Sequence, residues 1–317
     1  MISRRSVRIK AMQAVYARER SVGSPALHFE THLKKNILSV QDQYIFHLLL
    51  IREVANFAGK MAVIKANKFL KSEGDSNYST KIISNLFIQY LNNDVSFLDK
   101  IKKSKIDQFI KEDIIRKLHS DFAQLPIYIE YIESEKEFDF EQDKKIIKAL
   151  YEEIILENEL VNNLFDEIWP TWEDDIEFVH SLTIDAVKKS KEDLKTHLTK
   201  NSALEKFQEI MDFGMELYFK TLSNKEDHMA LIMPKLKNWE MDRIAVLDQI
   251  ILRMALTEFT EFNSIPLKVT INEYLDISKE YSTPKSKDFI NGILDKIMNE
   301  LKENGKIQKM GRGLINN

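Results

Sequence analysis

The sequence predicts an all-helical protein, and its composition and patterning carry that prediction. Its 317 residues include only 8 glycines and 6 prolines, about 4% of the chain, whereas the usual combined share is about 12%. Barrels and sandwiches need many tight turns, which this composition supplies poorly. Hydrophobic residues make up 44% of the chain, enough to bury a sizeable core, and they recur at the spacing of amphipathic helices.

The first predicted helix covers Arg4–Arg20. At about 100° per residue, Val7, Ala11 and Ala14 gather on one side of it. A neighbouring sector holds larger and charged side chains, namely Arg5, Arg8, Met12 and Tyr16. The glycine, serine and proline at 23–25 are helix breakers and end this segment.

Residues from about 33 to 200 predict a succession of amphipathic helices. Their expected ranges are 41–69, 81–90, 106–119, 121–132, 142–168 and 173–198. Breakers between them lie at 72–79, at 92–93 and at Pro170. The acidic stretch 130–141 indicates a solvated surface.

The last third predicts five further helices, at about 203–223, 227–236, 242–260, 269–280 and 284–302. Thr283 is the expected N-cap of the last one, with Pro284 at its first helical position. Gly292 lies inside that helix, where glycine is less favourable than alanine. We therefore expect a neighbouring helix to approach Gly292 closely.

Charge is distributed unevenly along the chain. The formal net charge is −4, but residues 1–20 carry +5, residues 302–317 carry +3, and the remaining 281 residues carry −12. Both ends are basic and the middle is acidic. This asymmetry suggests an anionic partner at the termini.

Several classes of chemistry find no support in the sequence. The absence of cysteine excludes disulfides, thiolate metal sites and thiol nucleophiles, and it fits a reducing cytoplasm. There is no glycine-rich phosphate loop and no His-Glu-x-x-His motif, and His28 and His32 have no carboxylate ligand placed beside them. We find no transmembrane segment and no secretory signal. We therefore predict a cytoplasmic protein that is not an enzyme and needs no cofactor.

RNA binding finds more support. Arg5, Arg8 and Tyr16 could combine phosphate contacts with a ring that stacks on an unpaired base. Alternatively, the arginines are solvated and Tyr16 lies at the edge of the core. A second candidate is the helix start between Tyr281 and Phe289, which has lysines beside two aromatic rings; Phe289 could equally be a core residue.

Several motifs in order resemble one known family. They are Leu-Arg-Met-Ala-Leu-x-Glu at 252–258, Ile-Asn-Glu at 271–273 and Phe-Ile-Asn-Gly at 289–292. The longer stretch 239–259 and the opening run from Arg4 to Tyr16 are similar to helices of the same family. This is the NusB antitermination family, whose fold is a bundle of two helical halves.

The resemblance covers residues 1–20 and about 204–302. It implies a discontinuous NusB-like RNA-binding domain made of residues 1–30 and 201–317. Residues 31–200 have no counterpart in compact family members. They look like a helical insertion whose role the sequence does not reveal.

The resemblance also implies a function and a set of site residues. Family members bind boxA-type single-stranded RNA of nascent ribosomal RNA transcripts, together with the ribosomal protein NusE, in the antitermination complex of RNA polymerase. Carried over by position, the expected RNA-binding residues are Arg4, Arg5, Arg8, Gln13, Tyr16, Tyr281, Lys285 and Phe289. The expected partner-binding residues are Asp248, Arg253 and Glu258. By the same comparison, Asn272, Glu273 and Asn291 are expected to be structural.

Two rival functions remain. A NusB-like domain also precedes some ribosomal RNA cytosine methyltransferases, but those require a glycine-rich cofactor domain and catalytic cysteines, which this chain lacks. The other rival is a helical scaffold in which the acidic insertion binds proteins and RNA binding is weak or general.

Overall fold

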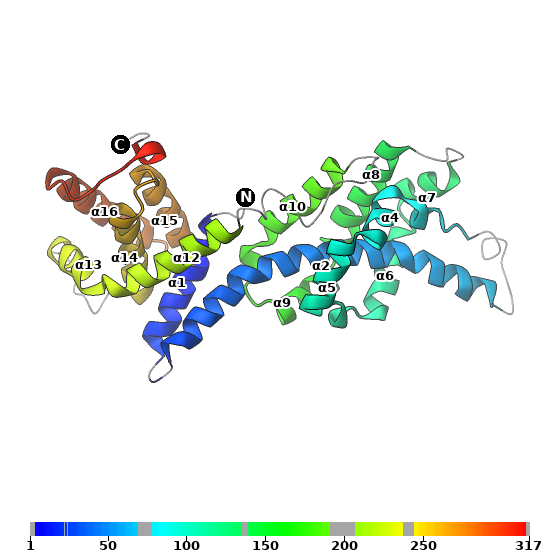
Figure 1. Cartoon of the computed structure of the whole chain (residues 1–317), viewed down its shortest axis with the longest axis horizontal. Coiled ribbons are helices and arrows are strands. Elements are labelled where there is room, and N and C mark those ends of the chain that lie inside the picture. The colour runs from blue at the N-terminus through cyan, green and yellow to red at the C-terminus, as the bar shows by residue number, and fades with distance from the viewer. Residues whose placement is uncertain are drawn as a thin grey trace. The chain divides into compact units, whose positions relative to one another are not determined.

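The computed structural model (Figure 1) describes residues 4–21, 23, 25–68, 78–134, 139–190, 207–236 and 244–314. Among these residues there are helices and no strands, which confirms the all-α prediction. They divide into two compact units, one of Leu38–Lys206 and one of Ile2–Ile37 with Phe207–Asn317. In the part of the chain so described, no helix is long and apolar enough to cross a membrane.

The unit that contains both chain ends is built around helix α14 (Val246–Glu261). Helices α1, α12, α13, α15 and α16 all pack against it, and every residue from Ile250 to Phe259 is buried. A helix covered on all sides has no solvent face for its charged residues. The other elements are α1 (Arg4–Arg20), the start of α2 (Ala26–Ala66), α12 (Phe207–Ser223), α13 (Lys225–Ile232), η6 (Met233–Lys235), α15 (Leu267–Tyr281), α16 (Ser286–Glu303) and η8 (Gly311–Leu314).

Helices α1 and α12 pack side by side at a glycine (Figure 1). A Cβ atom on Gly214 of α12 would lie 2.5 Å from Val7 Cγ1 and 2.9 Å from Ile37 Cδ1. Glycine therefore allows the close approach here. The expectation of a close neighbour at Gly292 was wrong, because a Cβ atom there would meet no atom within 4 Å.

The other unit consists of the remainder of α2 and the helices that follow it. Residues from Gln43 to Ile51 of α2 are all buried, which places this helix in the core of the unit. The further elements are η1 (Lys81–Ser84), α4 (Leu86–Asn93), α5 (Val95–Ser104), η2 (Ile106–Phe109), α6 (Glu112–Phe122), α7 (Pro126–Glu133), α8 (Phe140–Ala149), η3 (Leu150–Ile155), α9 (Glu159–Ile168), η4 (Trp172–Asp174) and α10 (Ile176–Lys189).

A buried histidine joins α2 to a short π-helix in this unit. Element η3 is a π-helix, and it places the hydroxyl of Tyr151 2.7 Å from His47 Nδ1. The ring of Phe165 packs edge-on against His47 at a centroid distance of 4.6 Å. Burial lowers the pKa of His47 to about 3, so the imidazole is neutral and shares a hydrogen bond with the Tyr151 hydroxyl.

Several predicted boundaries differ from the structure. Helix α2 begins at Ala26 instead of about 41, and α5 was not predicted. The predicted helix 142–168 is interrupted by η3 and by Asn158, whose side chain caps α9 by accepting from the Leu160 amide. Parts of other predictions lie outside the described residues, namely 135–138 of the acidic stretch, 203–206 of a helix and 239–243 of the family motif.

Candidate functional site

An open groove of about 470 Å³ runs along α1 in the unit that contains both chain ends. It is lined by Met12, Gln13, Tyr16 and Arg20 of α1, by Leu247 of α14 and by Tyr281 at the end of α15. Tyr16 is 41% exposed. The structure thus brings three of the predicted RNA-binding residues, Gln13, Tyr16 and Tyr281, to one surface.

A smaller pocket of about 170 Å³ adjoins the groove. Its lining includes Lys285 and Phe289, two further predicted RNA-binding residues, together with Asp248 and Ser286. Ala245, at the N-cap of α14, lines both hollows. Five of the eight predicted RNA-binding residues therefore line this connected groove and pocket.

Asp248 lies at the base of the small pocket and is only 5% exposed. Its two carboxylate oxygens accept hydrogen bonds from the hydroxyls of Ser282, at 2.6 Å, and Ser286, at 2.7 Å. This carboxylate is turned inward and holds the turn between α15 and α16, and the partner-binding role expected for Asp248 stays a prediction.

The start of α16 also differs from the prediction. The helix begins at Ser286 with Lys285 as its N-cap, and no side chain caps it. Thr283 instead places its hydroxyl 2.8 Å from the Ser286 hydroxyl. The expected capping hydroxyl is therefore part of the Asp248 network.

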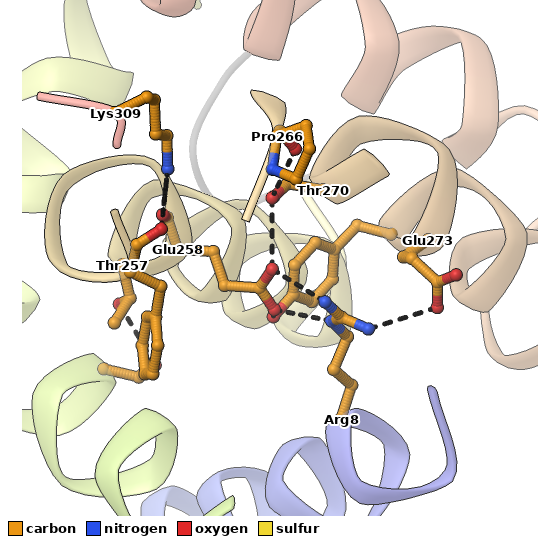
Figure 2. A network of polar contacts seen from close by, with 10 residues as sticks. Arg8, Thr257, Glu258, Pro266, Thr270, Glu273 and Lys309 are labelled. Carbon is orange, nitrogen blue, oxygen red and sulfur yellow. Dashed lines mark hydrogen bonds and ion pairs between the residues drawn. The ribbon is translucent and has the colours of Figure 1, made fainter. Parts of the chain in front are cut away.

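Arg8 is a core residue with 2% exposure. Figure 2 shows its guanidinium directed from α1 toward Glu258, with Nε 2.5 Å and Nη2 2.9 Å from the two carboxylate oxygens. Nη1 lies 3.3 Å from Glu273. Its guanidinium lies between two carboxylates of its own chain, and the phosphate contact expected for Arg8 stays a prediction that this burial does not favour.

Glu258 is fully buried and collects several donors besides Arg8. It accepts from the hydroxyls of Tyr274, at 2.8 Å, and Thr270, at 3.1 Å. Lys309 Nζ donates to the backbone carbonyls of Glu258 and Phe262 at 2.9 and 3.0 Å, and Figure 2 shows this lysine reaching the end of α14 from the opposite side to Arg8. Glu258 is therefore enclosed by residues of its own chain, and its expected partner-binding role stays a prediction.

Arg253, the third predicted partner-binding residue, is also buried. Its Nη2 lies 2.8 Å from Glu19 of α1, and Lys225 pairs with the same carboxylate at 3.1 Å. Neighbouring helices cover α14 at this position, and the expected partner-binding role of Arg253 stays a prediction as well. Of the residues expected to be structural, Glu273 contacts Arg8, whereas Asn272 is exposed.

The remaining arginines of α1 differ in how far their charges are already neutralised. Arg4 pairs with Glu209 at 3.3 Å, and Arg5 lies 3.6 Å from both Asp276 and Glu280 of α15. Arg20 is exposed and forms no ion pair with any residue that the structure describes. Sequence reasoning missed Arg20, although its position one helical turn after Tyr16 places both side chains on one face.

Comparison with known proteins shows which family part of this chain resembles. Residues 174–299 match the family model described as the NusB family. This part of the chain is similar to the NusB family. The match begins at the last residue of η4 and includes α10, α12 to α15 and most of α16. The groove residues on α14 to α16 therefore lie in the part that resembles NusB, whereas α1 lies outside the matched range.

The NusB relatives are bacterial proteins. Each of three is called "Transcription antitermination protein NusB": one from Salinibacter ruber is 43% identical over 104 residues, one from Chloroherpeton thalassium 40% identical over 104 residues, and one from Koribacter versatilis 38% identical over 94 residues. These alignments cover 33%, 33% and 30% of this chain and 65%, 49% and 64% of the relatives. The chain thus spans about half to two thirds of the length of the NusB proteins that it matches. No solved structure matches it.

Proposed function

We propose that this protein is a transcription antitermination factor that binds boxA-like single-stranded RNA of nascent ribosomal RNA transcripts together with the NusE ribosomal protein, as part of the RNA polymerase antitermination complex. Residues 1–30 and 201–317 form the RNA-binding domain in this proposal, and residues 31–200 are a helical insertion. No enzymatic step and no cofactor belong to the proposal.

The observation that supports it best is the groove beside the small pocket. Tyr16 and Tyr281 supply aromatic rings, Phe289 lines the pocket, and Arg20 and Lys285 supply positive charge at the same surface. Single-stranded RNA is bound by this combination, in which bases stack on rings and cations contact the backbone. The names of the NusB relatives add the context of antitermination.

The phosphate contacts in this proposal come from residues other than Arg8. Arg20 and Lys285 line the hollows directly, while Arg4 and Arg5 lie on the same helix in exposed ion pairs. Exposed ion pairs of this kind contribute little to stability and exchange readily with solvent ions or a ligand. We therefore assign Arg4 and Arg5 to a peripheral role in attracting RNA.

The function is tested by measuring RNA affinity for a boxA oligonucleotide and for a scrambled one, with and without NusE, over a range of salt concentrations. The proposal expects tighter binding of boxA, a further gain with NusE, and weaker binding as salt rises. Equal affinity for the two oligonucleotides would reduce the claim to general RNA binding. Absence of binding to either would favour the scaffold function.

The groove itself is tested by Tyr16→Ala. If the ring stacks on a base, this change should weaken RNA binding by about 1–3 kcal/mol. Phe219→Ala is the matched control, because Phe219 on α12 is 43% exposed, close to the exposure of Tyr16, yet does not line the groove. Equal losses in the two variants would show that the groove is not the RNA site.

A further inference from the structure

We infer that Asp248 is a positioning residue for RNA binding: it acts through Ser282 and Ser286 to hold the turn that presents Tyr281, Lys285 and Phe289. This role rests on the proposed function and concerns the same surface. It differs from the partner contact that the sequence suggested for Asp248.

Counting protons fixes the direction of the hydrogen bonds around Asp248. Each hydroxyl has one proton to donate, and the protons of Ser282 and Ser286 both go to the carboxylate. The short contact between Thr283 and Ser286 must then have Thr283 as donor, at 2.8 Å. The two serine oxygens lie 3.0 Å apart with no proton left for a bond between them, so the carboxylate is what holds them together.

This network joins three parts of the site. Asp248 lies in the first turn of α14, directly after Ala245 and Leu247, which line the groove. Ser282 follows Tyr281, the groove residue at the end of α15, and Ser286 lies between the pocket residues Lys285 and Phe289. Fixing the two serines therefore fixes the side chains on either side of them.

The local sequence offers these hydroxyls an ordinary alternative that they do not take. Serine and threonine before a helix usually cap its first amide groups, yet α16 has no side-chain cap. The hydroxyls of Ser282, Thr283 and Ser286 are instead committed to the network around the buried carboxylate. Helix α16 therefore lacks the stability that a side-chain cap would add, and the same hydroxyls instead fix the geometry of the turn at the pocket.

The test uses the double variant Ser282→Ala/Ser286→Ala, which leaves every charge in place. We expect its boxA affinity to fall by about 10-fold, by analogy with the loss of metal affinity when the residues that orient metal ligands are removed, with the salt dependence unchanged. Lys285→Ala provides the contrast, because loss of a phosphate contact should lower the salt slope by about 1. Ser282→Thr/Ser286→Thr keeps both hydroxyls and should retain the affinity of the wild type.

A second measurement separates positioning from simple stabilisation. Hydrogen exchange of the backbone amides from 282 to 289 should speed up in the alanine double variant at a temperature where circular dichroism shows it folded, while α1 exchanges as in the wild type. Unchanged exchange in the turn, or RNA affinity equal to that of the wild type, overturns the role of Asp248 alone. Wild-type protein that binds no RNA overturns the proposed function and this role with it.

Discussion

The guanidinium of Arg8 contacts both carboxylate oxygens of Glu258, although the two residues stand 250 positions apart in the chain. This pair fastens α1 to the central helix of its unit, and Glu273 adds a contact from α15. A buried ion pair therefore helps to hold in place the helix that carries half of the groove, in addition to its exposed ion pairs and its packing on α12.

Removing the cation of this pair should be costly. Arg8→Met leaves Glu258 buried without its charge partner, and we expect a loss of about 3–5 kcal/mol in the free energy of unfolding, measured by urea denaturation. Arg5→Ala is the control, because its ion pairs are exposed and should be worth about 1 kcal/mol or less. If Arg8→Met instead lowered the salt dependence of RNA binding without loss of stability, the assignment of Arg8 to the core would be wrong.

Gly214 provides a second stability prediction. Gly214→Ala would force a Cβ atom against Val7 and Ile37, and overpacking of this kind costs about 1–3 kcal/mol. Gly292→Ala is the matched control within a helix: its Cβ atom meets open space, so better helix propensity should stabilise the protein by about 0.5–1 kcal/mol. Thermal melts check this prediction: the melting temperature should fall in Gly214→Ala and rise in Gly292→Ala.

Arg5 offers a way to strengthen RNA binding. Its guanidinium is shared by Asp276 and Glu280, which compete with phosphate for the same charge. Asp276→Asn/Glu280→Gln should raise RNA affinity and steepen its salt dependence, with little change in stability. The control is Glu226→Gln/Glu303→Gln, which removes two carboxylates that form no ion pair with a described residue. Equal gains in both double variants would indicate a general effect of net charge.

The neutral imidazole of His47 predicts a pH effect on the other unit. Burial lowers its pKa from 6.5 to about 3, so between these values the unfolded chain binds more protons than the folded one. Stability is therefore lost as the pH falls. From pH 7 to pH 5 we expect the wild type to lose about 2 kcal/mol more than His47→Gln, whose amide can still form a hydrogen bond with Tyr151.

The fluorescence of Trp169 and Trp172, which lie in the same unit, can follow this unfolding in urea. His28→Gln serves as the control, because His28 is exposed at the start of α2. The same pH dependence in His47→Gln as in the wild type would mean that His47 is not the source of the effect.

The helices were predictable because local spacing determines them, and the aromatic and basic residues at the groove could be found by resemblance to a family. What the sequence could not reveal is which charged residues of α14 face inward. Periodicity assigns charges to a solvent face, but α14 has none, and the partners Arg8 and Glu19 come from a helix more than 200 residues earlier. Only the packing of distant segments shows that Arg253 and Glu258 are core residues.

The start of α16 follows the same principle. Thr283 and Pro284 form a sound local signal for a helix start, yet the structure begins the helix at Ser286. The hydroxyls near this helix start bond instead to the carboxylate of Asp248, which lies 34 positions before Ser282. The preference of a hydroxyl to cap a nearby helix is overridden when a distant buried carboxylate is a better acceptor for the same hydroxyl.

The shared lining at Ala245 has a practical consequence for the design of variants. A single larger side chain at this position, as in Ala245→Leu, would fill part of the groove and part of the pocket. The charged and aromatic residues of the site would all be kept. Such a change would alter the groove and the pocket together while leaving the sequence of residues 31–200 as it is, so that RNA binding could be tested apart from any role of those residues.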